Sequence, residues 1–150
     1  MANILKEICD RRLNDMAKKG YTLGHDVPET RTRPIVPFLP TPGTILEIKR
    51  ASPSKGDIMP DLDSVKTAGN YVNAGTAAIS VLTEENYFKG SLCDLKAVAE
   101  YVNAKGNKTA VLRKDFLLEP EEIEISYRLG ADAVLLIARI LETEKLIEMA

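Results

Sequence analysis

Residues 44–49 read TILEIK, and similar runs occur at 77–83 (AAISVLT), 109–114 (TAVLRK) and 131–137 (ADAVLLI). These runs are short, rich in valine, isoleucine and leucine, and only weakly alternating. That pattern is typical of strands covered on both faces, as parallel strands are. The runs start 33, 32 and 22 residues apart, which leaves room for a helix between each pair. We therefore predict four strands of a parallel sheet.

The segments between and after the runs carry apolar residues at helical spacing. The predicted helices begin near Asp61–Asp63, Ser91, Pro120 and Glu142–Thr143. Ser91 and Asp94 are spaced like a capping box, and Ile123 and Tyr127 form the apolar stripe of the third helix. Repeated strand–helix units place helices outside a parallel sheet, either in an open doubly wound sheet or in a (βα)8 TIM barrel. No glycine-rich dinucleotide or P-loop motif follows any run, so a doubly wound nucleotide-binding fold gains no support.

Residues 1–43 differ from the repeating part, residues 44–150. They open with a predicted helix over about residues 3–19, whose apolar stripe consists of Leu5, Cys9, Leu13 and Met16. Residues 21–43, called here the proline-rich segment, hold five of the eight prolines. Such a segment is a linker or wraps over the surface of a barrel. Its His25 and Arg33 have the pattern of ordinary surface residues.

Composition excludes several classes of protein. Twenty basic and 22 acidic residues give a net charge of −2, so we expect no nucleic-acid partner. No apolar run approaches the roughly 20 residues of a membrane helix, and we expect no membrane partner. The 84-residue gap between Cys9 and Cys93, together with a single histidine, predicts no bound metal. Both cysteines fall on apolar stripes, which favours reduced core thiols in a cytoplasmic protein.

Candidate catalytic residues lie at the ends of two predicted strands, where βα folds place their active sites. Glu47 and Lys49 are two positions apart and point to one face of the first strand. Lys114 ends the third strand and points away from Arg113. These residues form either an acid/base or anion-binding cluster in the barrel interior, or an exposed salt bridge and an exposed lysine.

Two loops that follow strands add candidate binding residues. Residues 50–57 (RASPSKGD) contain serines and a lysine that could contact phosphate, and residues 83–90 contain Tyr87 and Phe88, which could line an aromatic pocket. An ordinary turn and local loop packing explain the same two loops without a ligand.

Four motifs in this order and spacing resemble those of the indole-3-glycerol-phosphate synthase family. They are residues 45–56 (ILEIKRASPSKG), 79–91 (ISVLTEENYFKGS), 112–116 (LRKDF) and 129–137 (LGADAVLLI). The resemblance implies a TIM-barrel carboxy-lyase of tryptophan biosynthesis that uses no cofactor. Such an enzyme closes the indole ring of 1-(2-carboxyphenylamino)-1-deoxyribulose 5-phosphate with loss of CO₂ and water.

The same resemblance implies a role for individual residues. Lys114 would protonate the substrate ketone as general acid. Lys49 would lie beside the substrate carboxylate and phosphate, and Glu47 would take part in the proton movements of the dehydration. The residues implied to bind substrate are Ser52 at the phosphate end and Phe88, Phe116, Leu135 and Ile137 around the anthranilate ring. The last three are equally compatible with an ordinary core.

Chains of this family run to about 250 residues, so these 150 hold about four of eight βα units plus the extra N-terminal helix. We expect a fragment that is inactive alone and that needs a C-terminal half-barrel. Alternatively, the open edges of the first and fourth strands make it a self-associating half-barrel or a non-catalytic binding module. A third hypothesis is a Schiff-base aldolase acting through Lys49 or Lys114.

Overall fold

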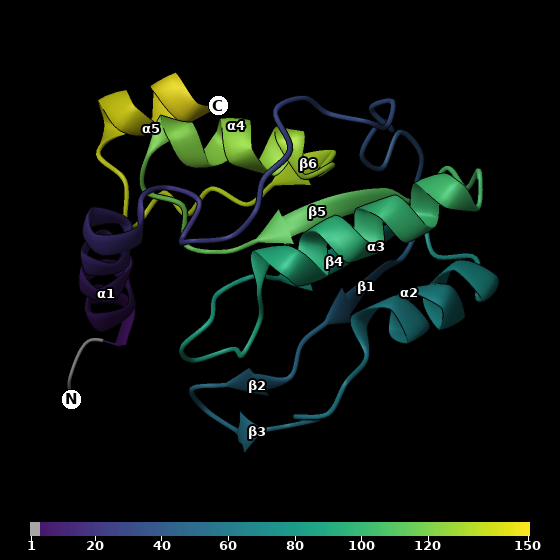
Figure 1. Ribbon diagram of the computed structural model, residues 1–150, viewed down its shortest axis with the longest axis horizontal. Coiled ribbons are helices and arrows are strands. Elements are labelled where there is room, and N and C mark those ends of the chain that lie inside the picture. The colour runs from purple at the N-terminus through teal and green to yellow at the C-terminus, as the bar shows by residue number, and fades with distance from the viewer. Residues whose placement is uncertain (1–3) are drawn as a thin grey trace.

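The computed structural model describes residues 4–150, which fold around a parallel sheet with helices packed against it (Figure 1). The sheet has the strand order β1-β4-β5-β6, with β1 at Ile45–Ile48, β4 at Ala78–Leu82, β5 at Ala110–Lys114 and β6 at Ala133–Val134. The helices are α1 (Ile4–Lys19), α2 (Ser64–Asn73), α3 (Leu92–Ala104), α4 (Pro120–Arg128) and α5 (Thr143–Met149). None of the helices in the described residues is long and apolar enough to cross a membrane.

Local sequence explains where the helices begin. Asp63 accepts a hydrogen bond from the Lys66 N–H at α2, and the Ser91 hydroxyl accepts one from the Cys93 N–H at α3, both at 2.9 Å. Ser91 therefore caps α3 as predicted, and the N–H group that it accepts is that of Cys93. At α4, Pro120 occupies the first turn, and the Glu122 carboxylate accepts from the N–H of Glu119 at 3.2 Å.

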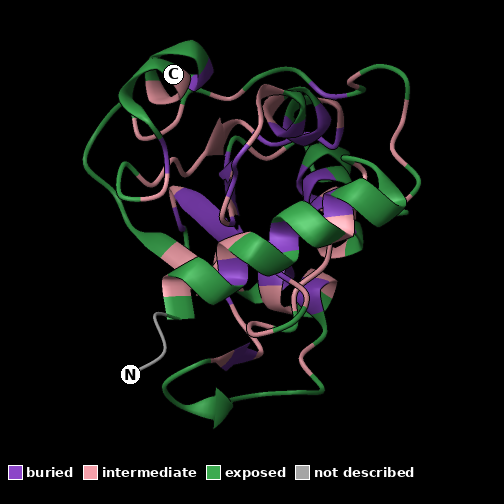
Figure 2. Ribbon diagram, turned by 90° about the vertical axis from the view of Figure 1, so that its left-hand side faces the viewer, coloured by how far each residue is buried: buried purple, intermediate pink, exposed green. Residues whose placement is uncertain are grey.

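The main hydrophobic core lies between the sheet and its helices. Ile48, Ile79, Val81 and Val111 point toward this core from three neighbouring strands. The residues of α2, α3 and α4 that pack against them are Ala68, Leu92, Leu95, Val98, Val102, Ile125 and Leu129. Figure 2 shows the buried residues concentrated on the strands and on the inner sides of the helices. The alternate residues of β1, β4 and β5 therefore belong to the opposite face of the sheet.

The predicted apolar stripes of α1 and α4 are right only in part, because Met16 is buried and Cys9 and Ile123 pack against a second hydrophobic core. In α1 the buried residues are Ile8, Arg12 and Met16, whereas Leu13 is 48% exposed. In α4 they are Glu122, Ile125 and Ser126, whereas Tyr127 is exposed. Both helices turn a polar residue inward because Arg12 and Glu122 meet in a buried ion-pair network, and apolar periodicity does not report such a contact. Asn3, at the predicted start of α1, lies outside the described residues.

The prediction of two core thiols is wrong for Cys93, whereas Cys9 packs against a second hydrophobic core that includes Met16 and Leu118. Cys9 is half-buried and Cys93 is exposed. Cys93 lies in the first turn of α3, on the side away from the core that Leu92 and Leu95 enter.

The proline-rich segment packs on the sheet. Asp132, at the start of the fourth run, accepts a hydrogen bond from Arg31 at 2.6 Å and one from Arg33 at 2.8 Å. The same carboxylate accepts backbone N–H groups of Val36 and Val111 at 2.9 and 2.8 Å. Arg33 is 6% exposed, so its interpretation as a surface residue is wrong. One buried carboxylate thus ties residues 31–36 to β5.

Two local details differ from the expected strands. Residues 51–57 form a small antiparallel hairpin of β2 (Ala51–Ser52) and β3 (Gly56–Asp57), where a flexible loop was expected. The fourth strand is reduced to two residues, although the Leu135 N–H still donates to the Arg113 carbonyl at 3.1 Å. Among the described residues β6 pairs only with β5, so it has strand hydrogen bonds on one side only.

Candidate active site

Glu47, Lys49 and Lys114 meet at the carboxyl ends of β1 and β5. One oxygen of Glu47 lies 2.8 Å from the Lys49 ammonium, and the other lies 2.6 Å from the Lys114 ammonium. The three side chains are between 26% and 40% exposed. The carboxylate thus lies between two cations in a partly shielded position, which differs from an isolated salt bridge on an edge strand.

Strand register explains why residues 67 positions apart meet. Glu47 on β1 is level with Ser80 on β4, and Leu82 on β4 is level with Lys114 on β5. Glu47 and Lys114 therefore share the face opposite the helices and reach each other across β4. The buried Ser80 hydroxyl on this face has no hydrogen-bond partner among the described residues.

The electrostatics of the cluster favour an ionised Glu47. Burial alone would raise its pKa, but hydrogen bonds from Lys114 and Lys49, with their positive charges, outweigh burial and lower the pKa. Glu47 is therefore a carboxylate at neutral pH, and both lysines donate to it. An anionic ligand that approaches the lysines competes with this carboxylate for their hydrogen bonds.

An aromatic pair comes from the loops that follow β4 and β5. The ring centroids of Phe88 and Phe116 lie 5.9 Å apart, with the rings inclined at 37°. Phe88 is positioned by Glu84, whose carboxylate accepts the backbone N–H groups of Asn86, Tyr87 and Phe88 at 3.0, 2.7 and 3.0 Å. Because Glu84 is 3% exposed, the three hydrogen bonds fix the loop from inside.

The comparison with known proteins identifies the family. Residues 37–150 match the family model described as indole-3-glycerol phosphate synthase. The chain belongs to the indole-3-glycerol phosphate synthase family. This confirms the resemblance that the four motifs indicated.

Two of three similar proteins carry the name of this family, and the third is a multifunctional protein. The chain is 48% identical over 132 residues to indole-3-glycerol phosphate synthase of Geobacillus kaustophilus, a match that covers 85% of this chain and 49% of that protein. It is 38% identical over 149 residues to the Bacillus cereus enzyme of that name, covering 99% of this chain and 57% of the relative. A multifunctional tryptophan biosynthesis protein of Schizosaccharomyces pombe is 39% identical over 156 aligned positions, covering 96% of this chain and 21% of the relative.

The predicted fold class is confirmed. The indole-3-glycerol phosphate synthase family is a TIM barrel, and the parallel sheet with helices on one face is part of such a barrel. The chain spans about half the length of the Geobacillus and Bacillus relatives.

The remaining predicted site residues of this synthase-family chain are less closely tied to the charged cluster. The Ser52 hydroxyl lies in the β2–β3 hairpin, 3.3 Å from the Lys55 N–H, and contacts neither lysine of the cluster. Leu135 and Ile137 are half-buried in the segment after β6. Tyr87 points its hydroxyl toward Glu7 of α1, so the expectation that it lines a pocket with Phe88 is wrong.

A buried ion-pair network flanks Lys114, and strand patterns in the sequence do not reveal it. Asp115 is paired with Arg113 at 2.9 Å and with Arg12, and its carboxylate also accepts the Thr83 hydroxyl at 2.5 Å. Burial raises the pKa of Asp115, but Arg12, Arg113 and Thr83 together lower it below the ordinary value. The other Asp115 oxygen accepts the N–H of Phe116 at 2.9 Å. The network therefore fixes the backbone on both sides of Lys114.

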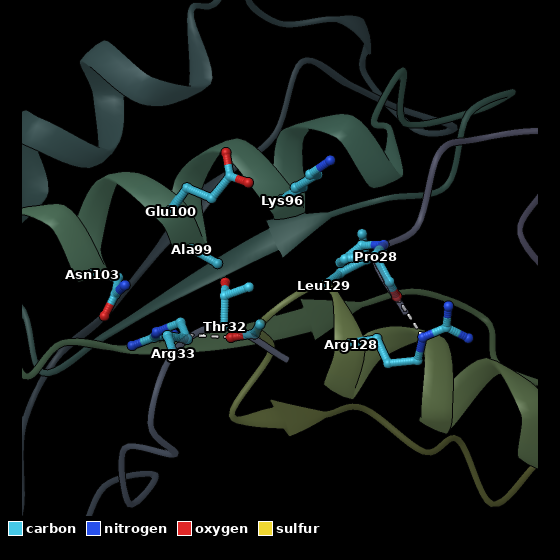
Figure 3. A pocket seen from close by; sticks show the side chains of 10 residues that line it. Pro28, Thr32, Arg33, Lys96, Ala99, Glu100, Asn103, Arg128 and Leu129 are labelled. Carbon is cyan, nitrogen blue, oxygen red and sulfur yellow. Dashed lines mark hydrogen bonds between the residues drawn. The ribbon is translucent and has the colours of Figure 1, made fainter. Parts of the chain in front are cut away.

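Hollows of about 230 to 400 Å³ lie away from the charged cluster, one beside Pro37 and Lys108 and two between α1 and Ile140. No group of three or more histidine, cysteine, aspartate or glutamate side chains in residues 4–150 is arranged to hold a metal ion. A pocket between the proline-rich segment, α3 and α4 has a volume of about 10 Å³ (Figure 3). That is room for about one water molecule. Arg33 and Arg128 close it by donating to the carbonyls of Gly130 and Pro28, both drawn as dashed lines in Figure 3.

Proposed function

We propose that this chain carries part of the active site of an indole-3-glycerol-phosphate synthase. The reaction closes the ring of 1-(2-carboxyphenylamino)-1-deoxyribulose 5-phosphate and releases CO₂ and water, without a cofactor. The observation that carries the proposal is the Glu47 carboxylate held between the Lys49 and Lys114 ammonium groups at the carboxyl ends of β1 and β5. The family membership supports the reaction.

Each group of the cluster has a task in this reaction. Lys114 donates a proton to the ketone oxygen while the ring carbon that bears the carboxylate attacks the ketone carbon. Lys49 binds the substrate carboxylate and phosphate as a cation. Glu47, released from one lysine when the anionic substrate binds, accepts and returns a proton during loss of water.

The apolar side of the proposed site receives the anthranilate ring. Phe88 and Phe116 form an inclined pair next to β4 and β5, and such a pair can pack against a further aromatic ring. We assign Leu135 and Ile137 to the same wall and Ser52 to the phosphate end, which follows from the family motifs. A cytoplasmic location also stays a prediction.

The proposal includes a partner that supplies the other half of the barrel, because the chain spans about half of its relatives. The test measures product fluorescence with the chain alone and with the chain joined to the second half of the Geobacillus kaustophilus relative. We expect no turnover by the chain alone and formation of indole-3-glycerol phosphate by the completed barrel. A folded, completed barrel that forms no product would refute the proposed function.

Self-association is a second candidate, and the sheet edges favour it. Among the described residues, β1 and β6 each have a neighbour on one side only, and Ile45 on β1 is 43% exposed. Light scattering on the chain after size-exclusion chromatography distinguishes the candidates. A discrete dimer with a cooperative thermal transition supports a self-associating half-barrel, and a monomer contradicts it.

A further inference from the structure

Three reactive side chains meet where the loop that carries Phe88 joins α3. The His25 Nδ1 atom lies 3.3 Å from the Cys93 sulfur, and the His25 Nε2 atom lies 2.5 Å from a Glu85 oxygen. The three residues come from the proline-rich segment, the loop after β4 and the first turn of α3. We propose that Cys93 is a reactive thiol, deprotonated by His25, that forms a mixed disulfide with low-molecular-weight disulfides.

The order of the groups is that of a nucleophile, a base and a residue that orients the base. Glu85 accepts a hydrogen bond from Nε2–H, which assigns the imidazole proton to Nε2 and leaves Nδ1 to accept the proton of the thiol. When His25 becomes an imidazolium, the Glu85 carboxylate stabilises the new positive charge. The His25 and Glu85 side chains are 22% and 29% exposed, so water screens their interaction only in part.

Cys93 also lies at the positive end of α3. Cys93 is the second residue of a helix that spans Leu92–Ala104, and the partial positive charge of a helix N-terminus stabilises an anion there. The carboxylate of the next residue, Asp94, is neutralised by Arg50, whose two nitrogens lie 2.6 and 2.9 Å from it. Lys96, three residues further along α3, pairs with the exposed Asp26 at 3.5 Å, so this pair adds no net charge near the thiol.

The reaction balances without another oxidant. Cys93 gives its proton to His25 Nδ1, and the thiolate attacks one sulfur of the small disulfide. The sulfur–sulfur bond of the reagent breaks as the bond to Cys93 forms. The second sulfur leaves as a thiolate and takes up the proton from the imidazolium. The exposed Cys93 sulfur is open to a reagent of this size.

The other cysteine provides an internal control. Cys9 lies half-buried on α1, and burial together with Asp10 raises the pKa of its thiol. Folding should therefore slow the reaction of Cys9 and accelerate that of Cys93.

The experiment treats the chain with glutathione disulfide at neutral pH and follows each cysteine by peptide mass spectrometry. In the wild-type chain we expect Cys93 to react at least about tenfold faster than Cys9. In His25→Asn we expect Cys93 to react about tenfold slower than it does in the wild-type chain. Glu85→Gln should slow the reaction less, and the exposed Glu121→Gln should leave it unchanged. An unchanged rate at Cys93 in folded His25→Asn would overturn the proposal.

A comparison within the wild-type chain keeps the test independent of how the variants fold. The rate at Cys93 is measured in the folded chain and in the same chain unfolded in urea. A short cysteine peptide measured with and without urea gives the effect of urea on the reaction itself, and the rates are corrected for it. A faster reaction in the folded chain supports the proposal. A slower reaction, or one equal to that of the unfolded chain, contradicts it.

Discussion

Replacing Arg12 by methionine tests how strongly α1 is held to the barrel strands. Arg12 is 5% exposed, pairs with Asp115 and lies 3.4 Å from Glu122, so the substitution removes one of two buried cations that serve these carboxylates. Methionine keeps much of the side-chain volume, so the loss of charge dominates the effect. Removing one partner of a buried ion pair costs about 3–5 kcal/mol, because the remaining charge stays buried. The free energy of unfolding of a small domain is about 5–15 kcal/mol, so Arg12→Met should lose a large share of the total stability.

The cost should depend on pH in a definite direction. The pKa of Asp115 is lower in the folded chain than in the unfolded chain, so Asp115 adds stability above the unfolded value of about 3.9. That contribution disappears as the pH falls through the folded pKa. Arg12→Met removes one cause of the low pKa, so its stability deficit should be full at pH 7 and smaller below about pH 4.

The assay is urea unfolding followed by circular dichroism at both pH values. Arg11→Met is the matched control, because Arg11 precedes Arg12 on the exposed side of α1. We expect the control to change the free energy of unfolding by less than about 0.5 kcal/mol. A loss of less than about 1 kcal/mol in Arg12→Met at pH 7, or a loss equal to that of the control, would refute the role of the network.

Three further substitutions test other contacts. Asp132→Ala removes the acceptor of Arg31, Arg33 and two backbone N–H groups. We expect the free energy of unfolding to fall by about 3–5 kcal/mol and residues 21–43 to be cleaved early by protease. Unchanged proteolysis would contradict this expectation. Glu84→Gln weakens the three hydrogen bonds that shape the Phe88 loop, so amide exchange at residues 86–88 should accelerate while exchange in α2 stays constant. Gly90→Ala would place a Cβ atom in steric conflict with the Leu82 carbonyl oxygen, so the loop must shift and the melting temperature must fall; an unchanged melting temperature would show that the close approach is absent.

The strands were predictable from sequence because their signal is local and strong. The runs at 44–49, 77–83 and 109–114 each contain one observed strand, and the alternation of Arg113 and Lys114 correctly placed them on opposite faces of β5. The fourth run, 131–137, yielded only Ala133–Val134, because strand length depends on neighbours as well as on composition.

The orientation of α1 and α4 could be predicted only in part from apolar periodicity. Arg12 and Glu122 lie 110 positions apart and turn inward because Arg12 meets Asp115, directly after β5, and Glu122 meets Arg113 on β5. A pattern based on hydrophobicity assigns both residues to the solvent. Which side of each helix faces inward therefore depends on contacts between residues that lie far apart in the sequence.

The candidate site was predicted in part. The spacing of Glu47 and Lys49 and the position of Lys114 indicated the charged cluster, and the structure brings these three together. Phe116 entered only through the family resemblance, since an apolar residue after a strand resembles ordinary core. The thiol cluster was missed because Cys93 and His25 are 68 positions apart and each alone has no distinctive spacing.

Turnover by the completed barrel with Lys114 replaced by methionine tests whether Lys114 is the proton donor. We expect the rate constant to fall by about 10²–10⁴-fold, because the general acid is lost. Lys108→Met, an exposed lysine before the same strand, is the control and should keep the wild-type rate. A Lys114→Met barrel that turns over substrate as fast as this control would contradict the assignment of Lys114 as proton donor.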